Sequence, residues 1–235
     1  MNGFPEILGL IPARKGSKGI TGKNIKMLGA KPLIQHTIES AIACEFLSTI
    51  LVSSDCEDIL QISSQFKGIE TPFIRPDEIS LDNTPTISVI KHAIEFYEKQ
   101  QKTFDYVCLL QPTAPFRSKN LIHEAIVKIM ETQADCLVTV SKIPDAYNPN
   151  WAFRMHGEDQ LFRVLEEEKL VSCRQELTPA FYRNGQVYII KTELIRNGIL
   201  LGGKLIGLIC EPGINLDTPA DWKNAENYVK NGATF

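Results

Sequence analysis

Short apolar runs alternate along the chain with longer segments in which apolar residues recur every three or four positions. The short runs favour buried strands, and the longer recurrence favours helices with one buried face. The expected strands cover residues 7–11, 49–53, 69–74, 106–110, 136–140, 187–190 and 204–209, and the expected helices cover residues 32–44, 86–99 and 118–132. Two further helices should begin near Asp55 and Thr218. This alternation predicts an α/β, Rossmann-like three-layer fold with a mostly parallel sheet.

Three local features sharpen this prediction. The run at residues 106–110 is the most apolar of all, so it should be the central strand. Asp55 and Thr218 each carry a side-chain oxygen that can cap the helix that follows. The helix over residues 32–44 should bury one face, made of Leu33, Thr37, Ile38, Ala41 and Ile42.

The regular pattern breaks between about residues 141 and 186. This stretch contains Pro144, Pro149 and Pro179, together with an acidic run at residues 166–168. Strand character resumes just afterwards, so we interpret the stretch as an arm inserted into a single domain that spans residues 1–235. A chain of 235 residues can bury a sufficient core without disulfides or a structural metal.

The composition is that of an ordinary globular protein, with 43% hydrophobic and 23% charged residues. The net charge of −3 and the lack of a long basic block argue against nucleic acid as a partner. The opening residues carry no signal-peptide pattern, and no apolar run is long enough to span a membrane, so we expect a cytoplasmic protein. The six cysteines are scattered without a CxxC pair and should be reduced and mostly buried.

The segment after the first strand, residues 12–24, differs in charge from the rest of the chain. Six basic residues and no acidic one lie between residues 14 and 31. A loop at the carboxyl end of a strand in an open α/β sheet faces the ligand crevice. The spacing fits neither GxGxxG nor the phosphate-binding P-loop, because Ser17, Lys18 and Asn24 stand where those motifs need other residues. Two interpretations stay open: a solvated basic turn, or a loop that wraps a triphosphate and neutralises a leaving pyrophosphate.

This loop resembles the signature of the acylneuraminate cytidylyltransferases, also called CMP-sialic acid synthetases. Further tracts in the same order extend the resemblance over nearly the whole chain. They are residues 53–55 (SSD), 75–78 (RPDE), 109–117 (LLQPTAPFR), 174–175 (RQ), 184–188 (NGQVY) and 215–218 (NLDT). The resemblance implies a fold of the nucleotide-diphospho-sugar transferase type, CTP and a nine-carbon 2-keto sugar acid as substrates, Mg²⁺ as cofactor, and a homodimer held by the inserted arm.

The resemblance also implies roles for particular residues. The nucleotide-binding residues would be Arg14, Ser17, Lys23, Asn24, Arg75 and Thr86, and the sugar-binding residues would be Gln111, Arg174, Gln175 and Tyr188. Arg14, Lys23 and Asp217 would take part in catalysis, and Asp217 with Asn215 would hold the metal. Taken without the resemblance, Gln111 is also compatible with an ordinary strand-end amide, Arg174 with a surface ion pair and Tyr188 with a core aromatic.

Two tracts depart from the family pattern. The family usually has two aspartates where this chain has Asn215 and Asp217, so one carboxylate is lost and the affinity for Mg²⁺ should fall. Sialic acid enzymes tend to have His-Pro-x-Lys where this chain has Asn148 and Trp151 on the arm. The missing ammonium argues against N-acetylneuraminate itself and makes a relative such as legionaminic acid a contender.

The sequence therefore predicts an enzyme that couples CTP to a nonulosonic acid, such as N-acetylneuraminate or legionaminic acid, and releases pyrophosphate. The anomeric hydroxyl would attack the α-phosphorus of CTP, with positioning and charge neutralisation supplying most of the rate. Two alternatives stay open. One is a cytidylyltransferase for the eight-carbon acid Kdo, and the other is a non-catalytic nucleotide- or sugar-binding relative that lost activity with the change at Asn215.

Overall fold

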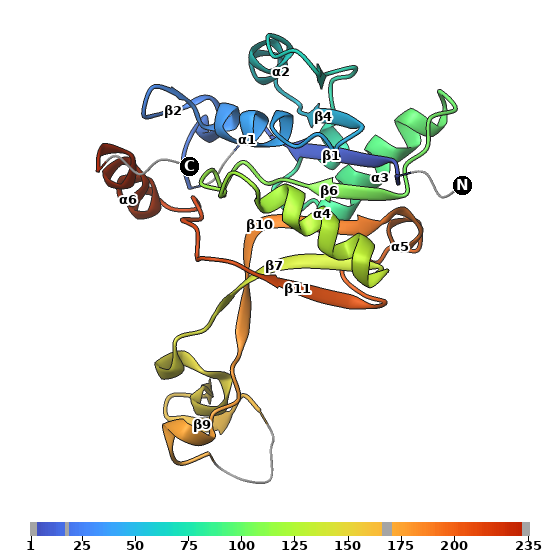
Figure 1. Cartoon of the computed structure of the whole chain (residues 1–235). Helices are drawn as coiled ribbons and strands as arrows, with labels where there is room; N and C mark the ends of the chain where they lie inside the picture. Colours follow the sequence, from blue (N-terminus) through green and yellow to red (C-terminus); the bar gives the residue numbers. More distant parts are fainter. Residues whose placement is uncertain (1–3, 17–18, 166–170, 232–235) are drawn as a thin grey trace.

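The computed structural model describes residues 4–16, 19–165 and 171–231, and within them a seven-stranded sheet forms the centre of the molecule (Figure 1). Its strand order is β11-β7-β10-β6-β1-β4-β5. The strands are β1 (Ile7–Pro12), β4 (Thr49–Ser53), β5 (Ile69–Glu70), β6 (Tyr106–Leu109), β7 (Cys136–Lys142), β10 (Phe181–Lys191) and β11 (Leu205–Ile209). The most apolar run, β6, occupies the middle position, as its sequence predicts.

The sheet is mostly parallel. β1 pairs in parallel with β4 and β6, β4 with β5, and β11 with β7. β10 is the exception, because it runs antiparallel between β6 and β7. In the register of β1 and β4, Pro12 lies opposite Ser53, so these two parallel strands end at the same edge of the sheet.

Helices cover both faces of the sheet and make a three-layer fold. The helices are α1 (Leu33–Ile42), α2 (Glu57–Ser64), α3 (Thr86–Glu98), α4 (Leu121–Thr132), α5 (Thr192–Arg196) and α6 (Pro219–Lys230). α1, α2 and α4 bury their apolar residues against one face, where Ile7 and Ile11 of β1 point. α3 and α5 pack on the other face, where Leu8 and Leu10 of the same strand point. This division follows from the alternation of side chains along a strand.

Short elements complete the body and the arm. Two pairs of short strands are β2 (Met27–Leu28) with β3 (Lys31–Pro32), and β8 (Phe153–His156) with β9 (Gln160–Arg163). The 3₁₀ turns are η1 (Lys23–Ile25), η2 (Asp77–Ile79), η3 (Asp145–Tyr147), η4 (Pro149–Trp151) and η5 (Arg174–Glu176). The last helix, α6, buries Trp222 in a small separate cluster with Leu28 and Leu216.

The structure corrects three local predictions. Asp55 does not cap α2: its carboxylate accepts a hydrogen bond from the backbone N–H of Lys15 instead, at 2.8 Å. Ile42 lies at the last position of α1 and is 41% exposed rather than buried. The third strand is only two residues long, because pairing with β4 ends at Glu70. By contrast, Thr218 caps α6 as predicted, in a reciprocal capping box with Asp221.

The irregular stretch of the sequence forms an arm that projects from the body (Figure 1). β7 and β10 extend into its base, where Phe181 pairs with Lys142, so both ends of the stretch from 141 to 186 belong to the sheet. The outer part carries the β8–β9 hairpin, in which Met155 lies opposite Leu161. Both of these side chains are exposed.

All six cysteines lie in the described part of the chain, and none of them forms a disulfide. Four are buried and two are partly exposed, in agreement with the prediction of reduced, mostly buried thiols. Within the same residues, no helix combines the length and the apolar character that crossing a membrane requires.

Candidate active site

A cavity of about 260 Å³ opens at the carboxyl ends of β1 and β6. This is the edge where ligands bind in open α/β sheets. Seven of the residues singled out in the sequence line it together: Arg14, Lys23, Asn24, Arg75, Thr86, Gln111 and Asp217. They come from segments spread over some two hundred positions of the chain, so the fold has gathered them at one place.

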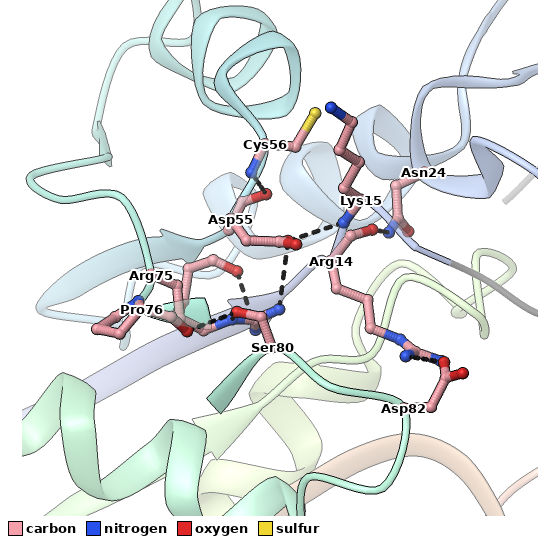
Figure 2. A network of polar contacts seen from close by, with 11 residues as sticks. Arg14, Lys15, Asn24, Asp55, Cys56, Arg75, Pro76, Ser80 and Asp82 are labelled. Carbon is pink, nitrogen blue, oxygen red and sulfur yellow. Dashed lines mark hydrogen bonds and ion pairs between the residues drawn. The ribbon is translucent and has the colours of Figure 1, made fainter. Parts of the chain in front are cut away.

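Arg14 lies on the loop after β1 and points across the cavity to Asp82, with which it forms an ion pair (Figure 2). Both side chains are about one-third exposed, so the pair lies at the cavity mouth rather than in the core. The Asn24 side chain stabilises the backbone of the loop, because it donates a hydrogen bond to the Arg14 carbonyl oxygen at 2.9 Å. The guanidinium of Arg14 is therefore partly exposed to the cavity and is already paired with a carboxylate.

Arg75 has a different environment. Its side chain is 3% exposed, and its guanidinium donates to the Ser80 hydroxyl at 2.9 Å and lies 3.6 Å from Asp55 (Figure 2). Burial lowers the pKa of the guanidinium, with the Asp55 carboxylate acting in the opposite direction. Since Asp55 also accepts the Lys15 N–H, one carboxylate joins Arg75 to the loop that carries Arg14. Arg75 thus links the Ser80 segment to the loop after β1 from within the protein.

Lys23 comes from the start of η1, and its side chain is almost entirely buried. Its ammonium donates to the Leu216 carbonyl oxygen at 2.7 Å and lies 3.6 Å from the nearer carboxylate oxygen of Asp217. Burial lowers the pKa of Lys23, while the neighbouring Asp217 acts to raise it. The contact places one cation and one anion side by side at the cavity wall.

The approach of the loop to the Asp217 segment depends on Gly19. A Cβ atom built on Gly19 would lie 2.0 Å from the Asp217 carbonyl oxygen, so no larger residue fits without moving the backbone. The packing of the loop on this segment thus requires glycine at that position.

Asn215 and Asp217 lie on the same side of an extended segment that precedes α6. Both are exposed, while Leu216 between them is fully buried, because side chains alternate in direction along an extended segment. The Asn215 side-chain amide donates to the Asp217 carboxylate at 2.9 Å. No group of three His, Cys, Asp or Glu side chains that could hold a metal occurs among the described residues. A hard cation here would therefore have one protein carboxylate and would take its other oxygen ligands from phosphate and water, as Mg²⁺ commonly does.

Gln111 follows β6 and meets a bend in β10. Gly185 has φ +78°, a left-handed conformation that favours glycine, and the register of β10 shifts between Arg183 and Tyr188. A Cβ on Gly185 would lie 3.5 Å from the side-chain oxygen of Gln111 and 4.0 Å from that of Asn215. Two side-chain amides therefore converge on this bend, beside the Asp217 carboxylate.

The structure does not bring every predicted residue to this cavity. Arg174 and Gln175 lie on the arm in η5, where the exposed Arg174 pairs with Asp145 at 2.6 Å. Tyr188 is 8% exposed and packs in the core, and burial raises its pKa. Its position corresponds to that of a core aromatic. Ser17 lies outside the described residues.

Sequence reasoning gave no role at the site to Asp55 or Asp82, the carboxylates beside Arg75 and Arg14. Asp55 lies in one of the tracts that carry the family resemblance, and the resemblance could have indicated a role for it. Nothing in the sequence around Asp82 indicated its contact with Arg14, because Arg14 is 68 positions away in the chain.

Residues 8–200 match the model of a family described as cytidylyltransferase. The chain belongs to the cytidylyltransferase family. This confirms the resemblance seen in the sequence and identifies the protein as a nucleotidyltransferase. It is 32% identical over 230 residues to the CMP-N,N'-diacetyllegionaminic acid synthase of Legionella pneumophila, a match that covers 95% of this chain and 96% of that one. It is 33% identical over 179 residues to a pseudaminic acid cytidylyltransferase of Campylobacter jejuni, with 76% of this chain and 75% of that one covered.

Solved structures agree on the fold. A CMP:2-keto-3-deoxy-manno-octonic acid synthetase complexed with CTP superposes with a TM-score of 0.70 at 15% identity, over 97% of this chain and all of that one. A 4-diphosphocytidyl-2C-methyl-D-erythritol synthase from Anaerococcus prevotii gives a TM-score of 0.64 at 13% identity, with the same coverage. The predicted Rossmann-like α/β class is confirmed.

Proposed function

We propose that this cytidylyltransferase couples CTP to a nonulosonic acid and releases the CMP-sugar and pyrophosphate. The observation that carries the proposal is the convergence of Arg14, Lys23 and Asp217 on one cavity at the carboxyl ends of β1 and β6. Cations there can bind a triphosphate, and the adjoining amides can bind a polyhydroxylated sugar acid. The full-length similarity to a synthase of a CMP-activated nonulosonic acid supports this choice of substrates.

The reaction needs little covalent chemistry from the protein. The hydroxyl on C2 of the sugar acid loses its proton to solvent and attacks the α-phosphorus of CTP. The new P–O bond forms, and the bond between the α-phosphorus and the pyrophosphate oxygen breaks. Arg14 and Lys23 would neutralise the charge that develops on the leaving pyrophosphate. The start of α3, where Thr86 lines the cavity and no side chain caps the helix, offers further phosphate contacts.

Mg²⁺ fits the donor set if the triphosphate completes its coordination. Asp217 would hold the ion through its carboxylate, with Asn215 as a neutral neighbour that already orients this carboxylate. When bound, the ion would polarise the α-phosphate and help to orient the triphosphate.

Among the described residues of one chain, the cavity lacks an arginine that could bind the carboxylate of the sugar acid at the proposed sugar side. Gln111 lies there, whereas Arg174, the residue suited to the sugar carboxylate, lies on the arm. We therefore include a homodimer in the proposal, in which the arm of one subunit supplies Arg174 to the site of the other. The exposed apolar side chains of the β8–β9 hairpin are consistent with such a contact.

The two arm residues that depart from the sialic acid pattern have partners within the arm. The buried Asn148 donates to the Thr178 carbonyl oxygen at 2.9 Å, and the Trp151 indole donates to the Val171 carbonyl oxygen at 2.8 Å. Because both donors are bonded inside the arm, neither replaces the lysine ammonium that sialic acid enzymes tend to have here. This favours a sugar acid that needs no contact with an ammonium at this point. Legionaminic acid derivatives thus come first in the panel of substrates.

The test is pyrophosphate release from CTP and Mg²⁺ with legionaminic, pseudaminic, N-acetylneuraminic and Kdo acids, each assayed separately. We expect turnover with one of the first three acids and formation of the matching CMP-sugar, identified by mass. Turnover with Kdo alone would establish the eight-carbon alternative. Binding of CTP without turnover for any acid would establish the non-catalytic alternative.

A further inference from the structure

Arg117 is a buried cation that the proposed reaction does not use. It follows the Gln111 tract, and only 1% of its surface is exposed. Among the described residues no carboxylate forms an ion pair with it, and burial lowers its pKa to about 10. A buried charge without a counter-ion destabilises a protein unless hydrogen bonds satisfy its donors.

The guanidinium of Arg117 donates to three different elements. It reaches the Gln111 carbonyl oxygen after β6 at 2.6 Å, the Gln186 carbonyl oxygen in β10 at 2.7 Å, and the Thr37 hydroxyl in α1 at 2.9 Å. The planar guanidinium can hold three acceptors in fixed directions, which the single ammonium of lysine cannot do. Arg117 thus bridges the segment after β6 and the bend in β10.

These two backbone points enclose the place where the side-chain amides converge. Gln186 directly follows Gly185, the left-handed residue against which the Gln111 side-chain oxygen lies. A shift of either carbonyl would therefore move the Gln111 amide relative to the bend and to Asn215.

We infer that Arg117 is a positioning residue for the sugar-acid side of the active site, acting through Gln111 and the Gly185 bend. The inference rests on the proposed function for the identity of the ligand that Gln111 meets. It assigns Arg117 no contact with either substrate.

The experiment uses two variants and a matched control in the full-length protein. Arg117→Lys removes the directed donors, and Thr37→Val removes one acceptor while keeping the side-chain shape. Ile129→Val is the control, because it makes a small change at a fully buried position near the end of α4, whereas Arg117 precedes the start of that helix. The ¹H–¹⁵N signals of the Gln111 side-chain amide, identified by their loss in Gln111→Glu, report its position without substrate.

We expect the Gln111 amide signals to shift in Arg117→Lys and Thr37→Val and to stay in place in Ile129→Val. The KM for the sugar acid should rise about tenfold or more in Arg117→Lys and about threefold in Thr37→Val, while the KM for CTP changes by less than about twofold. Unshifted signals, equal effects on both KM values, or an unchanged KM for the sugar acid would each overturn the inference. If Arg117→Lys does not fold, Thr37→Val decides the question. A wild-type protein that releases no pyrophosphate with any sugar acid would contradict the proposed function, and the amide signals would still decide whether Arg117 positions Gln111.

Discussion

The ammonium of Lys23 lies 3.6 Å from the Asp217 carboxylate. The same ammonium donates a hydrogen bond to the carbonyl oxygen of Leu216, the residue before Asp217. This contact joins the loop after β1 to the segment before α6, which are nearly two hundred residues apart in the chain. It places the cation proposed for the triphosphate beside the anion proposed for the metal. The protonation state of Lys23 therefore depends on the charge of Asp217.

The pH dependence should report the state of Lys23. Because its pKa is lowered by burial, its ammonium loses the proton below the ordinary value of 10.5. The charged form is the one proposed to bind phosphate, so kcat/KM for CTP should fall as the pH rises through this lowered pKa. In Lys23→Arg the guanidinium stays charged, so the alkaline fall should move to higher pH. A fall at the same pH in both proteins would show that another group controls it.

Arg14→Ala should lower kcat/KM for CTP by about 10²-fold or more, because a charge-assisted contact with the phosphates is lost in the transition state. The far-UV circular dichroism should stay unchanged, since Arg14 lies at the cavity mouth. Steady-state kinetics with CTP varied at saturating sugar acid is the measurement. Near-normal turnover would mean that the loop is only a solvated basic turn.

Asp82→Asn should have the opposite effect. With the competing carboxylate neutralised, Arg14 is available to the phosphates, and the Kd for CTP should fall about two- to fivefold, the size expected for a partly exposed ion pair. Calorimetric titration with CTP measures this. The matched control is Asp82→Asn in the Arg14→Ala background, where no change is expected. Weaker CTP binding in the single variant would mean that Asp82 positions Arg14 instead of competing for it.

The metal prediction concerns Asn215 and Asp217, on the segment before α6. Asp217→Asn should nearly abolish turnover, because two neutral amides and no carboxylate would then face the triphosphate. Asn215→Asp should lower the Mg²⁺ concentration needed for half-maximal rate, since it adds a hard anionic donor next to Asp217. Titration of Mg²⁺ at saturating substrates decides the matter. An unchanged rate and Mg²⁺ dependence in Asp217→Asn would place the ion elsewhere.

The arm should hold two subunits together. Phe153, Met155 and Leu161 lie on one face of the β8–β9 hairpin and are 52%, 65% and 55% exposed. An isolated two-stranded hairpin is marginally stable, so this face needs a partner. Light scattering at micromolar concentration should give about twice the chain mass of 26.3 kDa. Leu161→Glu should halve it, whereas Gln160→Glu, on the opposite face, should not. A monomeric wild type would contradict the prediction.

The sequence by itself determined the main strands and helices of the body and the edge of the sheet at which the cavity opens. Strands and helices are encoded by local periods of two and 3.6 residues, so β1, β4, β6 and their helices lie close to where the pattern predicts them. The basic loop after β1 had to lie at the ligand edge of the sheet, because chain direction fixes which strand ends meet. The Thr218 cap was also local, since donor and acceptor are three residues apart.

Only the tertiary structure decided which polar groups pair with one another. The Asp55 carboxylate could cap a helix or accept the Lys15 N–H. It accepts the Lys15 N–H because the fold brings the loop after β1 close to the segment after β4. Arg14 pairs with Asp82, 68 positions away in the chain, and Arg117 donates to the carbonyl oxygen of Gln186, 69 positions away. No local pattern encodes such pairs, because the hydrogen-bond partner of a charged side chain depends on which backbones the folded sheet brings within about 3 Å of it. The tertiary structure also decided between the interpretations left open for two residues, because it buries Tyr188 in the core and pairs Arg174 with Asp145 on the arm.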